Sequence, residues 1–415
     1  MRSRLNPIIT GAACLLAAAP SGAEAPRMAG EEFRVNQLEG GIQQSASVAL
    51  DAGGNVVVAW QSEVPGHGDE IRARRFDACG APRSDEIAVN AVSAGQQGAP
   101  AVAMTPEGSF VVAWQTIVQS NLEVRARRFD SRGAPAGGEI AVNTHTGNAN
   151  SDPAVAIDAR GNFVVAWEST IAGSYEIRAR RFDSRGAALS AEVAVNADTQ
   201  SSQRAPALAM ASDGRFVVAW RSNLDGSLEI RARRFDPSGT PASDELPVNT
   251  TRVGDQVAPT VAISPDGTFV IAWENAFDNN YDIRARPFDS QGTPKTDEFT
   301  VQPSSGAPQF APTLAMANNG HFLIAWQTFK AGHLDLQARP FTANATPLSE
   351  AFALNTVATG NQKSPALAIN ATGTFAAAWH SDAVGNWDIA ARTGGLQPTK
   401  RSACQRPSEG GTARK

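Results

Sequence analysis

One tryptophan-centred segment recurs seven times along the 415-residue chain, and this repeat restricts the possible folds more than any other feature. The tryptophans lie at positions 60, 114, 167, 220, 273, 326 and 379, first 54 and then 53 residues apart. Each one ends a V-V-A-W-like string, and an acidic residue that opens an E-I-R-A-R-R-F-D-like string follows it. Repeats of this length are typical of propellers and arrays, in which each copy forms one structural unit.

Each unit is predicted to form four β-strands. In the second copy we expect them at 101–104, 110–114, 123–129 and 139–143, because short apolar runs are separated there by glycine-containing turns. Glycine recurs before the second strand, at positions 54, 108, 161, 214, 267, 320 and 373. It adopts the positive φ of hairpin turns without strain. Four strands in one such unit make a propeller blade.

The two ends of the chain predict a closed ring. Strands one to three occur seven times, but no fourth strand follows the last copy, which ends near Arg392. An isolated fourth strand at 31–36 precedes the first copy, and we expect it to complete blade seven so that no sheet edge is exposed. The series of strand-four amides is Asn36, Asn90, Asn143, Asn196, Asn249, Gln302 and Asn355. The predicted fold is an all-β, seven-bladed β-propeller at 31–393 with four antiparallel strands per blade; a linear string of β-sandwiches is the alternative.

The first 23 residues have the composition of a secretory signal peptide. Arg2 and Arg4 precede an apolar run at 8–19, and small residues at 21–23 form a cleavage site. The alternatives are an uncleaved anchor, for which the apolar run is short, and a lipoprotein modified at Cys14. We expect export to the periplasm or the extracellular space, a leader at 24–30 and a disordered polar and basic tail at 394–415. No later segment is apolar enough to span a membrane.

Charge and cysteine content exclude some classes of protein. The formal net charge of −5 argues against a nucleic-acid-binding protein. Three cysteines are too few for a disulfide-built scaffold, although two remain after cleavage, Cys79 and Cys404. Cys79 lies in a turn of blade one, and the residues from 393 to 403 can extend ~36 Å at most, enough to cross one blade. We therefore expect a Cys79–Cys404 disulfide, with two free thiols as the alternative.

Two polar series are expected on one rim of the ring, which we call the top face, where the first strands begin and the second strands end. The amides that enter the first strands are Gln43, Gln97, Asn150, Gln203, Gln256, Gln309 and Gln362. The acids that open the third strands are Glu70, Glu123, Glu176, Glu229, Asp282, Asp335 and Asp388. Side-chain amides often satisfy buried backbone groups, so a structural role is the first interpretation. Gln97, Gln203 and Gln256 are also candidate ligand-binding residues.

One arginine series is complete in all seven copies. Its members are Arg74, Arg127, Arg180, Arg233, Arg286, Arg339 and Arg392. A group present in every blade usually builds the blade, so we expect a mostly buried structural ring in which each guanidinium contacts an acid or a tryptophan. An anion or sugar site in each groove is the alternative.

Residues that differ between copies are more informative about ligands. The position before the strand-three acid holds Asp69, Leu122, Tyr175, Leu228, Tyr281, Leu334 and Trp387. Tyr175, Tyr281 and Trp387 could stack on sugar rings, or could pack beneath a loop. A glycosidase would need two facing carboxylates, but Asp152 and Asp255 lie in loops of different blades without a visible partner. We predict no catalytic residue, no metal site and no cofactor.

The blade pattern resembles a known repeat. Around Trp220, Asp225-Gly226 and 230–236 it matches F-V-V-x-W-x-S, D-G and I-x-x-R-x-F-D, a repeat of bacterial exported and cell-surface proteins that here covers 31–392. This resemblance implies a structural family without shared catalytic residues. The predicted function is a non-catalytic, monomeric binding or scaffold module that binds a glycan or a protein at the top face. A glycosidase- or lyase-like enzyme and a purely structural domain are the alternatives.

Overall fold

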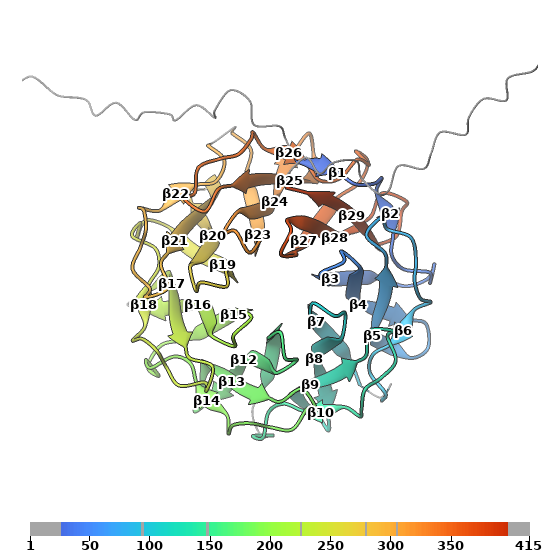
Figure 1. The fold of residues 1–415 in the computed structure, drawn as a ribbon, viewed down its shortest axis with the longest axis horizontal. Helices are drawn as coiled ribbons and strands as arrows, with labels where there is room; N and C mark the ends of the chain where they lie inside the picture. The colour runs from blue at the N-terminus through green and yellow to red at the C-terminus, as the bar shows by residue number, and fades with distance from the viewer. Residues whose placement is uncertain are drawn as a thin grey trace, which may run out of the picture.

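The computed structural model describes residues 26–396, apart from 93–94, 147–148, 225, 279 and 304–305. Seven antiparallel sheets surround a central axis (Figure 1). Six sheets have four strands, and the seventh has five because two short N-terminal strands join it. The seven-bladed β-propeller predicted from the repeat is therefore confirmed. Within this part of the chain there is no helix that could cross a membrane.

The blades are numbered by their inner strands, which line the axis. The inner strands are β3 (Gln43–Leu50), β7 (Gln97–Met104), β11 (Asn150–Ile157), β15 (Gln203–Met210), β19 (Asp255–Ile263), β23 (Gln309–Met316) and β27 (Gln362–Ile369). The second strands are β4 (Val56–Val64), β8 (Phe110–Val118), β12 (Phe163–Ile171), β16 (Phe216–Leu224), β20 (Phe269–Phe277), β24 (Phe322–Lys330) and β28 (Thr374–Ser381). The third strands are β5 (Gly68–Phe76), β9 (Asn121–Phe129), β13 (Ser174–Phe182), β17 (Ser227–Phe235), β21 (Asn280–Phe288), β25 (His333–Phe341) and β29 (Asp388–Gly395).

The outer strands are only two residues long. They are β6 (Ile87–Ala88), β10 (Ile140–Ala141), β14 (Val193–Ala194), β18 (Leu246–Pro247), β22 (Phe299–Thr300) and β26 (Phe352–Ala353), with β1 (Arg27–Met28) and β2 (Phe33–Arg34) in blade 7. They are shorter than the predicted fourth strands, although single backbone bonds continue the pairing, as from Val142 N–H to the Val124 carbonyl.

The N-terminal strand closes the ring, as predicted. Strand β2 pairs with β29 through Phe33 and Ala391, and Val35 N–H donates to the Ile389 carbonyl at 2.7 Å. Strand β1 pairs with the far end of β29, which continues to Gly395, two residues beyond the predicted end of the ring. Blade 7 thus contains both ends of the described chain, and its outer edge is covered.

An acid–arginine pair recurs on the third strands. In blade 1, Arg72 Nη2 lies 2.6 Å from Glu70 Oε2, two residues earlier on the same strand. The residue opposite Arg72 on the outer strand is Ala88. The same pair forms between Glu123 and Arg125 in blade 2, at 2.8 Å. Such a pair within one strand does not join distant parts of the chain.

In blade 7 the arginine lies on the outer strand and the alanine on the third strand, so the ion pair joins two strands. Ala390 stands where the other third strands carry arginine or glutamine, and Arg34 on β2 faces it. Arg34 Nη2 lies 2.9 Å from Asp388 Oδ1, which also accepts a bond from Asn36 Nδ2 at 2.8 Å. Asp388 therefore ties the two ends of the ring together across 354 residues.

The tryptophans fill the space between neighbouring blades. All seven are 0% exposed. Trp114 of blade 2, for example, packs in one cluster with Val57 and Ile71 of blade 1. Stacked phenylalanines add to this packing, such as Phe216 and Phe235, whose ring centroids are 4.7 Å apart. Close packing between the blades explains why the same large residues recur in every copy.

Six of the seven tryptophans donate their indole N–H to the amide that begins the inner strand, at 2.7–3.1 Å. Blade 6 is the exception. Among the described residues, Trp326 Nε1 and Gln309 Oε1 are buried without a hydrogen-bond partner, and so is Oε1 of the neighbouring Gln302. Gln302 stands where six copies have asparagine, so its amide is one methylene further from the backbone than theirs.

Candidate functional site

Every inner strand has a bulge near its top end. The residue two positions after the buried amide has a positive φ in all seven blades, 49° for Asp152 in blade 3. Aspartate adopts this conformation more readily than most residues other than glycine. The side chain that follows the tryptophan of the preceding blade can accept the bulge N–H. Asp152 N–H donates to Gln115 at 3.1 Å, and Ala311 N–H donates to Glu274 at 3.0 Å.

Two positions beside each bulge differ from blade to blade, and we call them the top rim. The residues after the amides are Gln44, Gly98, Ser151, Arg204, Val257, Phe310 and Lys363. The residues after the tryptophans are Gln61, Gln115, Glu168, Arg221, Glu274, Gln327 and His380. The two lie opposite each other in antiparallel register, as Ser151 and Glu168 do. These rim residues are free to serve a ligand because the repeat does not fix them.

A charged cluster forms at the top rim between blades 3 and 4. The guanidinium of Arg204 lies 4.2 Å from the centroid of the Tyr175 ring, and its Nε donates to Glu168 Oε2 at 3.1 Å. Glu168 is 1% exposed and also accepts Ala205 N–H at 2.6 Å. Arg204 is therefore held on both sides, while its two terminal nitrogens bond no group in the described part of the chain. A fixed guanidinium with free donors is suited to binding oxygen atoms of a ligand.

Asp152 is the exposed carboxylate of this cluster. Ser45, Ala99, Ala205, Ala258, Ala311 and Ser364 occupy the six equivalent bulge positions. Surrounding protein atoms raise the pKa of Asp152, and Arg204 opposes the rise. Burial also raises the pKa of Glu168; Ala205 N–H and Arg204 oppose this, whereas the charge of Asp152 adds to it. The sequence shows no partner for Asp152, whereas the structure brings its charge close enough to Glu168 to raise the pKa of that second carboxyl.

The cluster combines acceptors and donors that suit a polyhydroxylated ligand. The exposed carboxylate of Asp152 can accept two hydroxyl groups, and Arg204 can donate from its two terminal nitrogens. A carboxyl whose pKa is raised beside a second carboxylate can also act as a general acid. A third rim carboxylate, Glu274 in blade 5, has its pKa raised by burial as well.

The three predicted aromatic residues lie half-buried at the rim, each beneath the residue that follows an amide. Arg204 covers Tyr175, Phe310 packs on Tyr281 at 4.8 Å, and the Nζ of Lys363 lies 4.8 Å from the Trp387 ring centroid. One face of each ring is therefore occupied by protein. Stacking of sugars on the remaining surface of these rings stays a prediction.

The predicted ligand-binding amides are not available at the surface. Gln97, Gln203 and Gln256 are 3%, 1% and 0% exposed. Each accepts an indole N–H and donates to a loop carbonyl, as Gln203 does with Trp220 and Ser201. We therefore assign these amides to the interior rather than to a ligand site.

The arginine ring joins neighbouring blades, but through other partners than expected. Each member donates to a backbone carbonyl of the preceding blade, at 2.8–3.0 Å. Arg127, for example, donates to Val89 and lies 5.7 Å from the Phe129 ring centroid. The expectation of an acid or tryptophan partner is wrong, apart from the 3.5 Å contact of Arg339 with Glu350. Arg74 and Arg339 are buried, whereas the other five are half-buried.

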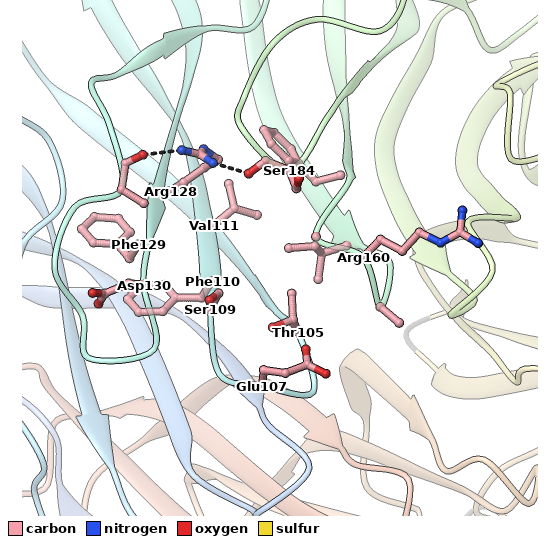
Figure 2. Close-up of a pocket in the computed structure, with 15 residues that line it drawn as sticks. Thr105, Glu107, Ser109, Phe110, Val111, Arg128, Phe129, Asp130, Arg160 and Ser184 are labelled. Carbon is pink, nitrogen blue, oxygen red and sulfur yellow. Dashed lines mark hydrogen bonds between the residues drawn. The ribbon is translucent and has the colours of Figure 1, made fainter.

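The opposite, bottom side of the ring contains hollows lined by repeated residues. One hollow of about 270 Å³ lies between blades 2 and 3, where Arg128 donates to the carbonyls of Ala136 and Ser184 (Figure 2). The same inter-blade bond recurs from Arg75 to the Arg132 carbonyl, at 3.0 Å. This hollow therefore belongs to the joints between blades. Among the described residues, no group of three or more histidines, cysteines, aspartates and glutamates could hold a metal ion.

Cys79 is disulfide-bonded. Its predicted partner Cys404 lies outside the described residues, and so do the predicted signal peptide and most of the C-terminal tail. The pairing of Cys79 with Cys404 stays a prediction.

Comparison with known proteins shows the fold. No protein-family model matches the chain, and no curated protein matches its sequence. In structure it is similar to a protein of unknown function from Dyadobacter fermentans, with a TM-score of 0.55 and 12% identity over 88% of this chain and 98% of that one. It is also similar to the polysaccharide lyase Uly1, with a TM-score of 0.55 and 8% identity over 90% and 100% of the two chains. The GH93 α-L-arabinofuranosidase of Fusarium graminearum, solved with arabinobiose, has a TM-score of 0.50 and 12% identity over 75% and 97%.

Three residues of the top rim were not expected from the sequence: Glu168, Arg204 and Lys363. Arg204 and Glu168 lie in different blades, and only the bulge geometry brings them together. A comparison of the seven copies position by position was the available indication, because the rim positions are those where charge changes between otherwise similar blades.

Proposed function

We propose that this protein is an exported propeller that binds a glycan at the top rim, over the junction of blades 3 and 4. The observation that carries the proposal is the position of Arg204, which Tyr175 and Glu168 hold in place and whose charge acts on the exposed Asp152. This arrangement occurs at one of seven otherwise equivalent junctions. It offers hydroxyl acceptors and donors side by side, as sugar recognition requires.

Two further findings support this assignment. Structural neighbours at low identity include a polysaccharide lyase and an arabinofuranosidase solved with arabinobiose, so the same fold acts on glycans elsewhere. The disulfide at Cys79 is consistent with an oxidising compartment and hence with export by residues 1–23. Membership in the bacterial exported repeat type and a monomeric state belong to the same proposal.

The test is isothermal titration of the purified protein with neutral oligosaccharides, starting with arabino-oligosaccharides. We expect Arg204→Ala and Asp152→Asn each to weaken binding about ten- to hundredfold, because each removes hydrogen bonds to a charged group. Arg132→Ala and Asp297→Asn are matched controls, since both residues are exposed at the bottom of the ring. Binding that survives both rim substitutions, or no binding to any glycan, would contradict the proposal.

A second candidate function is glycan cleavage. The raised pKa values of Glu168 and Asp152, which lie in one cluster, favour it, because a general acid needs a carboxyl that keeps its proton to a higher pH than usual. Wild-type protein would then release reducing ends or form an unsaturated product that absorbs ultraviolet light. Asp152→Asn would stop turnover, whereas a binding module would show no turnover in either form.

A further inference from the structure

Lys363 occupies the top-rim position after the amide of blade 7, which is the position of Arg204 in blade 4. It is half-buried, and its Nζ lies 4.8 Å from the ring centroid of Trp387. An ammonium group over an indole is held by the electrostatic field of the ring. Asp382 is close enough to interact with its charge, but Asp382 accepts two bonds from Asn361 instead. In the described part of the chain, Lys363 forms no ion pair.

His380 lies opposite Lys363 in the register of β27 and β28, with its ring edge-on to Trp387 at 5.0 Å between centroids. Among the described residues its Nδ1 is buried without a hydrogen-bond partner. Burial, and then the charge of Lys363, lower its pKa to about 4, although Asp382 opposes the shift. The imidazole is therefore neutral near pH 7. The half-buried ammonium of Lys363, which has no counter-ion among the described residues, is the group of this pair that an anionic ligand can bond, and the neutral imidazole adds no competing charge.

We propose that Lys363, Trp387 and His380 form a subsite for an anionic group of the glycan, a carboxylate or a sulfate. The inference rests on the proposed function, since it assigns a second part of the same rim. Lys363 supplies a charge-assisted hydrogen bond to the anion, and the indole holds the ammonium in place. A neutral sugar would leave this cation without a counter-ion.

The two sides of the rim thus suit different parts of one ligand. Arg204 forms an ion pair with Glu168 and lies near Asp152, so the rim at blades 3 and 4 suits neutral hydroxyl groups. Blade 7 follows three blades later, and β27 lies across the ring from β15 (Figure 1). The substrate class is therefore an acidic polysaccharide, bound by its hydroxyls on one side and by its charged group on the other.

The experiment titrates the full-length mature protein with three oligosaccharides of equal length: oligogalacturonate, a sulfated galactan and a neutral arabinan. Lys363→Met keeps the apolar stem on Trp387 and removes the charge. Lys330→Met is the control, because Lys330 is an exposed lysine at the end of β24 on the same face. We expect Lys363→Met to weaken binding of an acidic oligosaccharide about tenfold or more, to leave neutral binding unchanged, and Lys330→Met to change neither. The acidic ligand that responds identifies the group as carboxylate or sulfate.

Unchanged affinity of Lys363→Met for both acidic ligands would overturn the inference. Tighter binding of the neutral arabinan than of either acidic ligand by wild type would also overturn it. If Arg204→Ala still weakens neutral binding in that case, the proposed function stands alone. If wild type binds none of the three oligosaccharides, the inference and the proposed function both fail.

Discussion

The two ends of the inner strands differ in how closely they follow the repeat. At the bottom end the last residue is always a large aliphatic side chain, and these seven residues line one hollow of about 270 Å³ around the axis: Leu50, Met104, Ile157, Met210, Ile263, Met316 and Ile369. At the top end the residue after the amide is different in all seven blades. Packing around the axis restricts the residue types at the bottom end, whereas the residues beside the bulge at the top end can vary between blades. The comparison teaches that repeated residues build the ring and that the residues unique to one blade are the ones left available for a ligand.

The largest effect expected within the repeated part concerns ring closure. Asp388 is the member of the repeated acid series whose side chain joins the two ends of the described chain, through Arg34 and Asn36. We expect Asp388→Ala to lower the free energy of unfolding by about 2–3 kcal/mol, because it strands Arg34 and the largely buried Asn36. Denaturation with urea measures this.

The control is the equivalent substitution in blade 6. Asp335 accepts Asn355 Nδ2 at 3.0 Å, within one continuous stretch of chain. Asp335→Ala should cost about 1 kcal/mol, because it removes this hydrogen bond and a partly exposed contact with His333 at 3.2 Å. Equal losses for the two variants would show that Asp388 has no special role in closure. Neither variant should change the affinity for a neutral oligosaccharide, which is bound at blades 3 and 4.

The next prediction concerns His380, a residue of the top rim that the repeat does not fix. His380 is neutral in the folded protein because its pKa falls from 6.5 to about 4. Its contribution to stability is therefore present above pH 6.5 and is lost as the pH falls through about 4. His380→Gln introduces the residue found in blades 1, 2 and 6. Between pH 7 and pH 4, the free energy of unfolding should fall by about 2–3 kcal/mol less in this variant than in wild type.

The measurement is a series of urea denaturations across that pH range. Lys363 and Asp382 act on the same imidazole in opposite directions, so Lys363→Met should reduce the pH dependence as well. Parallel pH profiles for wild type and His380→Gln would contradict the account. The protonation of His380 would then have no effect on the free energy of unfolding.

The smallest expected effect comes from restoring the repeat where it is broken. Gln302→Asn should return the amide to the position that asparagine takes in the other six copies. It should also let Gln309 accept the indole N–H of Trp326, since the side chains of Gln302, Gln309 and Trp326 have buried atoms without a partner among the described residues. We expect a gain of about 1 kcal/mol in the free energy of unfolding. A loss of stability would mean that another group already satisfies these atoms.

The fold could be predicted from the sequence because it depends on repeated local patterns. Seven Trp-centred copies and one displaced strand determine seven blades and their closure. The exchange of Arg34 and Ala390 was visible in the sequence, but its meaning required the pairing of β2 with β29. Element length was less predictable, since the outer strands depend on single backbone bonds.

The site could be predicted only in part. Tyr175 was identified because it breaks the repeat, and Asp152 was noticed as a unique acid. Their partners could not be found, because Glu168 and Arg204 meet across a blade boundary. The amides were expected to be accessible because they are polar residues near a rim. The sequence does not show that each of them bonds a buried indole. The arginine partners were wrong because backbone carbonyls leave no trace in a residue pattern.

The central claim is that ligands bind where the inner strands depart from the repeat. Hydrogen–deuterium exchange, followed by mass spectrometry with and without saturating oligosaccharide, tests it most directly. We predict slower exchange in peptides that contain the rim segments 150–153 and 203–205, with no change in the bottom turns at 105–109 and 158–162. Protection of the bottom turns with an unchanged rim would contradict the account.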